Sequence, residues 1–273
     1  MRPFGTDDNE QAHQQEKEPE AFPLRESLRA DTFWVSRTGQ RHLREGGKCE
    51  DVSLILEHGG FRFWGLADGQ EGKLFCREGG KAALGAVARY LEGKGIAALA
   101  AHPHPDELQY ALIRRIRSTL EALALTHGAA LQDFSSTLIA LAIDPVTKDY
   151  ILIHLGDGFV VGTKKEPRAK ILSFPENGIT QNYTWLTTSP DAIGHLRVYR
   201  GSAKNYSRLL LLTDGATMLC RQGNIARRAE ALLSPPGRPE DILAAVRAGN
   251  PQDDASCIII NLDPEPGIDT TIV

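Results

Sequence analysis

Short apolar blocks, and apolar positions that alternate with polar ones, recur along the chain from Thr32 onward and predict a protein rich in β-strands. His58-Gly59-Gly60 separates two such blocks and predicts a hairpin turn. Residues 37–49 form a polar, Gly-rich stretch that predicts a loop. The expected strands are residues 32–36, 52–57, 61–67, 135–144, 149–157, 159–165, 169–174, 207–214 and 256–262.

Two segments after the first hairpin have apolar residues at helical spacing, Lys81–Leu91 and Asp106–Ala124. Further helices are expected up to about Leu233 and over residues 239–249, while residues 182–201 read as irregular. Strands joined by hairpins, with helices grouped in pairs, favour an α+β fold with antiparallel sheets over a doubly wound parallel sheet. The chain has no GxGxxG or P-loop motif that would point to the second arrangement.

The first 27 residues differ from the rest, because they are rich in Gln, Glu, Asp and Pro and show little apolar periodicity. Such a segment buries too little apolar surface to offset the entropy of ordering it, so residues 1–27 are expected to be a disordered acidic tail. A chain of 273 residues with 41% hydrophobic residues can form a large core. We expect one large domain over residues 28–263 and a C-terminal tail over residues 264–273.

Charge and cysteine usage exclude several classes of function. The net charge of −4 and the pI of about 6.1 give no broad basic surface, so nucleic acid is not an expected partner. The four cysteines have no CxxC spacing, and the histidines show no zinc-site spacing. No signal-like N-terminus and no run of about 18 apolar residues occurs, so neither export nor membrane insertion is expected. These features together favour a cytoplasmic enzyme.

Three expected strands end in the same dipeptide, at Asp68-Gly69, Asp157-Gly158 and Asp214-Gly215. A carboxylate at the end of a buried strand is held in place by the packed segment behind it, and the glycine lets the backbone or a ligand approach closely. For a single occurrence, Asp-Gly is more often a hairpin turn. Asp68 and Asp214, however, are followed by loop and helix patterns and not by a second strand.

Two more acidic pairs lie beside strands, Glu50-Asp51 before residues 52–57 and Asp253-Asp254 before the last strand. If these strand ends come together, like charges would repel strongly without a cation between them. Oxygen-only ligands favour Mg²⁺ or Mn²⁺ over Zn²⁺. The pattern therefore predicts a site for a hard divalent cation.

In this order, Glu50-Asp51, ADG at 67–69, SSTLIALAID at 135–144, LGDG at 155–158, LLTDG at 211–215 and DDAS at 253–256 resemble the metal-dependent protein phosphatases of type 2C. The resemblance covers roughly Phe33 to Leu262. The GKCED sequence and residues 182–201 are most similar to a bacterial branch of that superfamily. The resemblance implies a central sandwich of two antiparallel β-sheets flanked by pairs of α-helices, with a binuclear Mn²⁺ or Mg²⁺ centre at one end.

The resemblance also implies the ligands of that centre. Asp51 and Asp68 match the residues that hold and bridge the two metals, and Gly69 matches one that supplies a backbone carbonyl. Asp214 and Asp253 match the remaining ligands of the first metal. Two cations about 3.5–4 Å apart would lower the pKa of a bridging water and so activate it for direct attack on phosphorus.

Other acidic residues have supporting roles in the resemblance. Asp157 matches an aspartate associated with a third, weaker metal, and Glu50 matches a residue that acts largely through water. Asp254 stands where the family often has Asn, and it either adds charge to the site or caps a turn. No CxxxxxR loop for cysteine chemistry is present, so Cys49 is interpreted as a packing residue.

The chain departs from the eukaryotic enzymes where they use an arginine to bind the substrate phosphate, because Gly46 lies five residues before Asp51. Arg44, His42 and Lys48 are the nearby replacements, and Lys48 is favoured because it is closest to the metal ligand. For Arg44 and Lys48, a solvated loop charge is an equally good reading. His42 either donates a proton to the leaving alkoxide or has a structural role in the loop.

Three functions are compatible with these residues. The first is an active serine/threonine phosphoprotein phosphatase with a cognate serine/threonine kinase, which the complete carboxylate set favours. The second is a catalytically silent module of the same fold that binds or regulates phosphoproteins. The third is a metal phosphoesterase for a small molecule, because specificity in such folds resides in loops.

Overall fold

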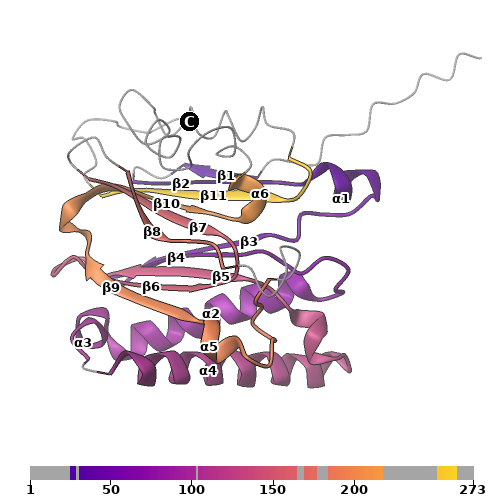
Figure 1. Cartoon of the computed structure of the whole chain (residues 1–273), viewed down its shortest axis with the longest axis horizontal. Helices are drawn as coiled ribbons and strands as arrows, with labels where there is room; N and C mark the ends of the chain where they lie inside the picture. Colours follow the sequence, from indigo (N-terminus) through magenta and orange to yellow (C-terminus); the bar gives the residue numbers. More distant parts are fainter. Residues whose placement is uncertain are drawn as a thin grey trace, which may run out of the picture.

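The computed structural model describes residues 25–28, 31–102, 104–164, 169–176, 184–217 and 251–262. In this part of the chain, two antiparallel β-sheets lie face to face, and helices cover the outer face of one of them (Figure 1). This is the α+β sandwich expected from the sequence.

The first sheet has six strands in the order β1-β2-β11-β10-β7-β8. They are β1 Arg25–Leu28, β2 Thr32–Arg37, β7 Phe159–Lys164, β8 Ala169–Ser173, β10 Tyr206–Leu212 and β11 Ala255–Asn261. Strand β11 is almost entirely buried and pairs with both β2 and β10. The first sheet therefore joins the beginning and the end of the described chain.

The second sheet has five strands in the order β3-β4-β5-β6-β9. They are β3 Val52–His58, β4 Phe61–Ala67, β5 Leu138–Ile143, β6 Asp149–Leu155 and β9 Arg197–Ser202. Successive side chains of a strand point to opposite faces of the sheet. Accordingly, Phe63 and Ala67 of β4 belong to the core under the helices, whereas Trp64 and Leu66 belong to the core between the sheets.

The long helices α2 Cys76–Lys94 and α4 Pro105–His127 pack against each other, and α2 packs on the second sheet. The short helices α3 Ile96–Ala100 and α5 Ala192–His195 lie on the same side (Figure 1). Helices α1 Gln40–Arg44 and α6 Asp214–Thr217 lie at one end of the first sheet. Two 3₁₀ turns, η1 Leu131–Phe134 and η2 Ala203–Asn205, complete the described elements.

Several elements differ from the sequence-based expectation. Residues 40–44, expected to be part of a loop, form α1, and residues 197–202, expected to be irregular, form the edge strand β9. Strand β1 begins at Arg25, inside the segment expected to be a tail. The helices expected up to about Leu233 and over residues 239–249 lie outside the described residues, apart from the four residues of α6.

Candidate metal and substrate site

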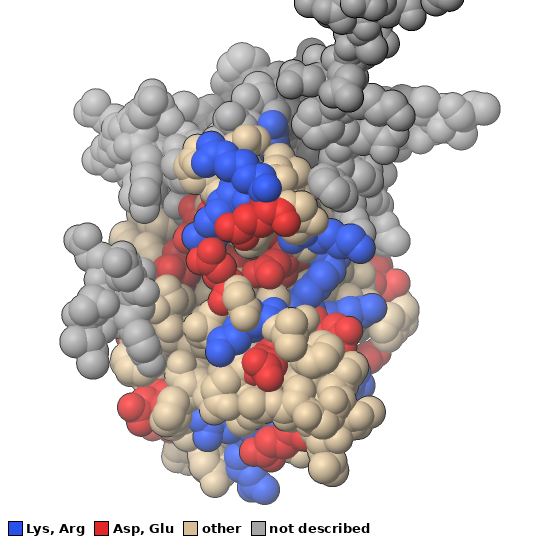
Figure 2. Space-filling model, turned by 90° about the vertical axis from the view of Figure 1, so that its right-hand side faces the viewer, with Lys and Arg blue, Asp and Glu red and all other residues tan. Residues whose placement is uncertain are grey.

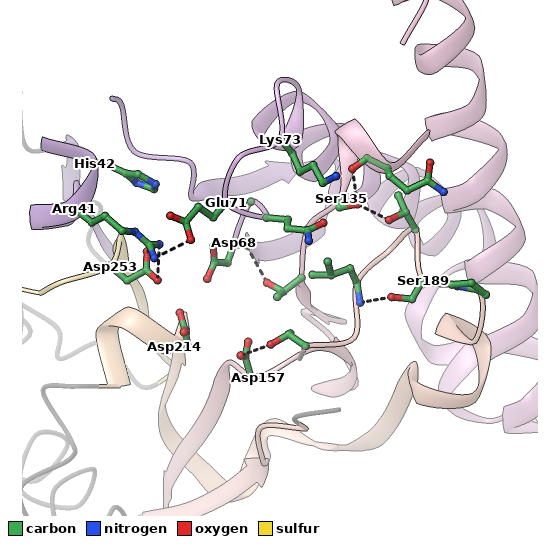
Figure 3. Close-up of a pocket in the computed structure, with 18 residues that line it drawn as sticks. Arg41, His42, Asp68, Glu71, Lys73, Ser135, Asp157, Ser189, Asp214 and Asp253 are labelled. Atoms are coloured by element: carbon green, nitrogen blue, oxygen red, sulfur yellow. Dashed lines mark hydrogen bonds and ion pairs between the residues drawn. The ribbon is translucent and has the colours of Figure 1, made fainter. Parts of the chain in front are cut away.

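A cavity of about 680 Å³ lies at the end of the sandwich that carries α1 and α6 (Figure 3). Acidic side chains gather in a recess on this face of the molecule, and basic side chains lie around it (Figure 2). The carboxylates on the cavity wall belong to Asp68, Glu71, Asp157, Asp214 and Asp253. The other lining residues are Arg41, His42, Gly69, Gln70, Lys73, Gln132, Ser135, Thr137, Thr184, Leu186, Thr188, Ser189 and Pro190.

The aspartates reach the cavity from both sheets, and each lies at a strand end. Asp68 directly follows β4, and Asp157 follows β6 of the second sheet. Asp214 follows β10 and Asp253 precedes β11 in the first sheet. Thr137 fixes Asp68 in place, because its backbone N–H donates to the Asp68 carbonyl at 2.8 Å and its hydroxyl accepts from the Asp68 N–H at 3.0 Å.

Asp51 stands directly behind these residues, at the start of β3, and its exposed fraction is only 2%. Its Oδ2 accepts a hydrogen bond from the Thr213 hydroxyl at 3.1 Å. Its Oδ1 is buried and has no hydrogen-bond partner among the described residues. A buried carboxylate oxygen without a partner is costly, so this atom is a candidate ligand for a cation.

The carboxylates strongly influence one another. Burial raises the pKa of Asp51, and the charges of Asp254 and Asp214 raise it further. Burial also raises the pKa of Asp68 well above its usual value, with added contributions from Asp51 and Asp214. Asp51 therefore belongs electrostatically to the same cluster as Asp68 and Asp214, although it does not line the same cavity.

Two further aspartates extend this cluster. Burial raises the pKa of Asp157, and the charge of Asp214 adds to this effect. The Thr184 hydroxyl donates a 2.7 Å hydrogen bond to Asp157 and so favours its charged form. The pKa of Asp253 is likewise raised by burial and by Asp214.

Asp254 has a different environment from its neighbour Asp253. Its carboxylate accepts hydrogen bonds from the backbone N–H of Gly39 at 2.7 Å and of Glu50 at 2.5 Å. His42 Nδ1 lies 2.9 Å from Asp254 Oδ2. Burial alone would lower the pKa of His42, but the nearby Asp254 carboxylate raises it, which favours the protonated imidazole. Asp254 and His42 together hold the segment between β2 and β3 against the end of β11.

Arg41 is a cavity residue that the sequence analysis missed. Its Nη2 lies 3.2 Å and 3.3 Å from the two carboxylate oxygens of Asp253, and its Nη1 lies 2.8 Å from Glu71 Oε2. Arg44, by contrast, is exposed and does not line this cavity, and Lys48 lines a second one. The position of Arg41 depends on helix α1, which the sequence pattern did not indicate.

The Protein phosphatase 2C family profile matches residues 38–245, which is most of the chain. The chain belongs to the protein phosphatase 2C family. The matched region contains Asp51, Asp68, Asp157 and Asp214, while Asp253 and Asp254 follow it. No curated protein matches the chain.

Solved structures of bacterial phosphatases share the fold of this family member. A bacterial serine phosphatase superposes with a TM-score of 0.63 at 14% identity, over 86% of this chain and 99% of that one. Serine/threonine phosphatase Stp1 from Staphylococcus aureus gives 0.62 at 14% identity, over 87% and 96%. RsbX in complex with magnesium gives 0.58 at 13% identity, over 88% and 100%. At such identities the likeness establishes the fold only.

The residues present fit the divalent cations on which protein phosphatases of type 2C depend. Within the described ranges, no three His, Cys, Asp or Glu side chains form a ready-made metal site. The chemistry of the cluster is nevertheless that of a cation site, because its donors are oxygens, its charges repel and Asp51 Oδ1 has no partner in the described structure. Gly69 lies beside Asp68 on the cavity wall.

Cys49 and Glu50 lie in the wall behind the cluster. Burial raises the pKa of the Cys49 thiol strongly, which disfavours the thiolate that a cysteine nucleophile requires. Burial also raises the pKa of Glu50, whose Oε2 has no hydrogen-bond partner in the described structure. Trp185 and His195 stack on each other with ring centroids 3.6 Å apart.

No helix in the described part of the chain is long and apolar enough to cross a membrane.

Proposed function

We propose that this protein phosphatase 2C family member is an active, metal-dependent phosphatase that hydrolyses phosphoserine and phosphothreonine in proteins. The observation that carries the proposal is the convergence of Asp51, Asp68 and Asp214 from three strand ends into one cluster of interacting carboxylates. A fold that kept such a cluster without a cation would lose stability. The cluster thus supports an active enzyme over a silent module.

In this proposal, the protein ligands of two Mn²⁺ or Mg²⁺ ions would be Asp51, Asp68, Asp214, Asp253 and the backbone carbonyl of Gly69. Such ions, when bound, lower the pKa of water toward neutrality and polarise phosphoryl oxygens. These residues come from strand ends of both sheets, so they would hold the ions in fixed positions. No side chain needs to form a phosphoenzyme.

The remaining acidic residues support this arrangement. We assign Asp157, oriented by Thr184, to a third and weaker cation site. Glu50 would act through water, and Asp254 acts through the backbone that it holds.

Arg41 is the cation that we assign to the substrate phosphate. A guanidinium can bind phosphate with two parallel hydrogen bonds, and Arg41 shares the cavity with Asp68 and Asp214. Lys48 and Arg44 remain the alternatives. His42 lines the cavity, but its contact with Asp254 favours a role in positioning the loop that carries Arg41.

We infer a phosphorylated side chain of a protein as the substrate, and the polar lining of the cavity supports this inference. Serine and threonine phosphatases among the structural relatives support this choice. A cognate serine/threonine kinase and a cytoplasmic location are part of the proposal.

The test is hydrolysis of p-nitrophenyl phosphate and of phosphoserine peptides with Mn²⁺ or Mg²⁺, before and after EDTA. Asp214→Asn should reduce kcat by at least about 100-fold, because it removes a ligand charge with little change of volume. Asp106→Asn, at an exposed position of α4, is the matched control and should retain full activity. Hydrolysis of small phosphate esters but of no phosphopeptide would indicate that the enzyme is a phosphoesterase for small molecules. No hydrolysis of either would contradict the proposal.

A further inference from the structure

A second cavity, of about 490 Å³, lies on the other side of Asp51. It is formed by the end of β2, the segment 48–54 that leads into β3, and the first turns of α2. Three cationic side chains line it, those of Lys48, Arg77 and Lys81. Among the described lining residues only Asp51 is acidic, and its carboxylate is buried in the cluster described above. This cavity is therefore basic, whereas the first is acidic.

The three cations have no ion-pair partner among the described residues. This distinguishes them from Arg41, which contacts both Asp253 and Glu71. Lys48 and Lys81 are exposed, and Lys81 follows Arg77 by one helical turn, so both α2 residues lie on the same side of the helix. Their charges are free to interact with an anionic ligand.

Arg77 is held in place by backbone carbonyls, and no described carboxylate neutralises its charge. Its Nη1 donates to the backbone carbonyl of Cys49 at 2.5 Å and to that of Asp51 at 3.1 Å. Its Nε and Nη2 make no hydrogen bond within the described ranges. A guanidinium held by one nitrogen presents the others in a fixed orientation, which is favourable for binding a carboxylate.

The cavity also meets the open edge of a strand. Val52, Ser53 and Leu54 all line it, although consecutive side chains of a strand point to opposite faces. A cavity that contacts all three therefore adjoins the strand edge. In the described structure β3 pairs only with β4, and the buried Ser53 Oγ has no hydrogen-bond partner. An unpaired edge can accept an extended peptide as an additional strand.

We propose that this cavity is a docking site for an extended acidic segment of the phosphoprotein substrate. The segment runs along the open edge of β3, and its carboxylates contact Lys48, Arg77 and Lys81. Asp51 lines this cavity and interacts electrostatically with Asp68 in the first. In this proposal one substrate therefore occupies both cavities, with its phosphorylated residue in the acidic one. This inference rests on the proposed function and adds a substrate class to it, namely phosphoproteins with an acidic stretch near the phosphorylated residue.

The test uses pairs of phosphoserine peptides that differ only in a flanking stretch, which is Glu in one peptide and Gln in the other. One pair carries the stretch before the phosphoserine, and a second pair carries it after. The wild-type enzyme should prefer the better-placed Glu peptide by roughly 3- to 10-fold in kcat/KM, as expected for partly exposed charge pairs. Lys81→Glu should abolish or invert this preference through KM, while Lys81→Arg should keep it. Lys94→Glu, at the exposed end of the same helix, is the matched control and should behave as wild type.

Hydrolysis of p-nitrophenyl phosphate separates the two proposals, because it requires the metal site but not the docking site. Lys81→Glu should leave this activity unchanged. Binding of the unphosphorylated Glu peptide, measured by fluorescence anisotropy, should weaken in Lys81→Glu and at high salt. Equal kcat/KM for Glu and Gln peptides in an enzyme that hydrolyses p-nitrophenyl phosphate would overturn the docking site alone. An equal loss in Lys81→Glu and Lys94→Glu would also overturn it.

Discussion

Asp253 and Asp254 are adjacent in sequence, yet the structure gives them different chemical roles. Asp254 accepts two backbone hydrogen bonds and lies 2.9 Å from His42 Nδ1, so the protein compensates its charge. Asp253 is half-buried and faces the cavity, with Arg41 as its partner. A carboxylate whose charge is balanced by hydrogen-bond donors of the protein has a structural role. A buried or cavity-facing carboxylate oxygen with few such donors is a candidate metal ligand. By this criterion Asp51 is the strongest candidate ligand.

Single substitutions can distinguish which basic side chain near the cavity binds the substrate phosphate. If Arg41 binds the substrate phosphate, Arg41→Ala should raise the KM for a phosphopeptide by roughly tenfold with a smaller change in kcat, as expected for a charge-assisted contact. Lys48→Ala should have less effect on p-nitrophenyl phosphate, because Lys48 lines the other cavity. Arg44→Ala, on an exposed face of the same short helix, tests the other alternative and should leave KM unchanged. Steady-state kinetics in which only Lys48→Ala raises the KM for both substrates would return the assignment to Lys48.

The acidic residues could be found from the sequence because each directly follows or precedes an apolar block, and strand ends are local features. Asp68, Asp157, Asp214 and Asp253 line one cavity, and Asp51 lies behind it. Arg41 could not be found in this way. Its position depends on a five-residue helix whose backbone N–H groups at residues 40 and 41 donate to the carbonyls of Pro251 and Gln252, far away in sequence.

At the scale of elements, strands with dense apolar sequences were predicted well, and elements with few apolar residues were not. The hairpin β3–β4 and the strands β5, β6, β10 and β11 carry dense apolar patterns. Every residue of β9 is only partly buried, and its sequence RVYRGS has no apolar alternation. This strand forms by pairing with β6, which is a tertiary effect that local sequence does not encode.

Helix α2 is positioned by close backbone contact at its first turn, and this contact can be tested. A Cβ at Gly79 would lie 2.0 Å from the carbonyl oxygen of Phe134 in η1, so Gly79→Ala must displace backbone. We expect a loss of about 2–4 kcal/mol in the free energy of unfolding, as for overpacked buried sites.

Gly93 lies in the same helix with no atom within 4 Å of its added Cβ. Gly93→Ala should therefore stabilise the protein by about 0.5–1 kcal/mol through helix propensity. Urea denaturation of both variants measures the difference. Equal effects of the two substitutions would mean that the contact between α2 and η1 does not constrain the fold.

At the scale of the whole molecule, the carboxylate cluster links the two sheets. Asp51, Asp68 and Asp157 come from strands of the second sheet, and Asp214 and Asp253 come from strands of the first. Stacking the sheets therefore brings like charges together in a buried region, which opposes folding in the absence of a cation. Cations that bind the cluster should stabilise the folded state by mass action.

This repulsion predicts a stability profile for the metal-free protein and for Asp51→Asn. In EDTA at pH 7–8, Asp51→Asn should melt at a higher temperature than wild type, because it removes a carboxylate whose folded-state pKa is raised above its ordinary value of 3.8. Because the pKa is raised, the charged carboxylate lowers the free energy of unfolding at pH values above 3.8, and this loss vanishes below 3.8. The advantage of the variant should therefore disappear near pH 4. Each 1 kcal/mol corresponds to about 2–4 °C for a domain of this size.

With Mn²⁺ bound, wild type should melt at a higher temperature than Asp51→Asn, the reverse of the order in EDTA. Wild type should gain several degrees in Tm with saturating Mn²⁺ or Mg²⁺, whereas Asp51→Asn should gain little, because a proposed ligand has lost its charge. Asp106→Asn should follow wild type in both conditions. Differential scanning calorimetry with and without EDTA provides the measurement and does not depend on catalytic activity. Stabilisation of wild type by Zn²⁺ alone, or an equal response of Asp51→Asn to Mn²⁺, would show that the acidic cluster is not a site for hard divalent cations.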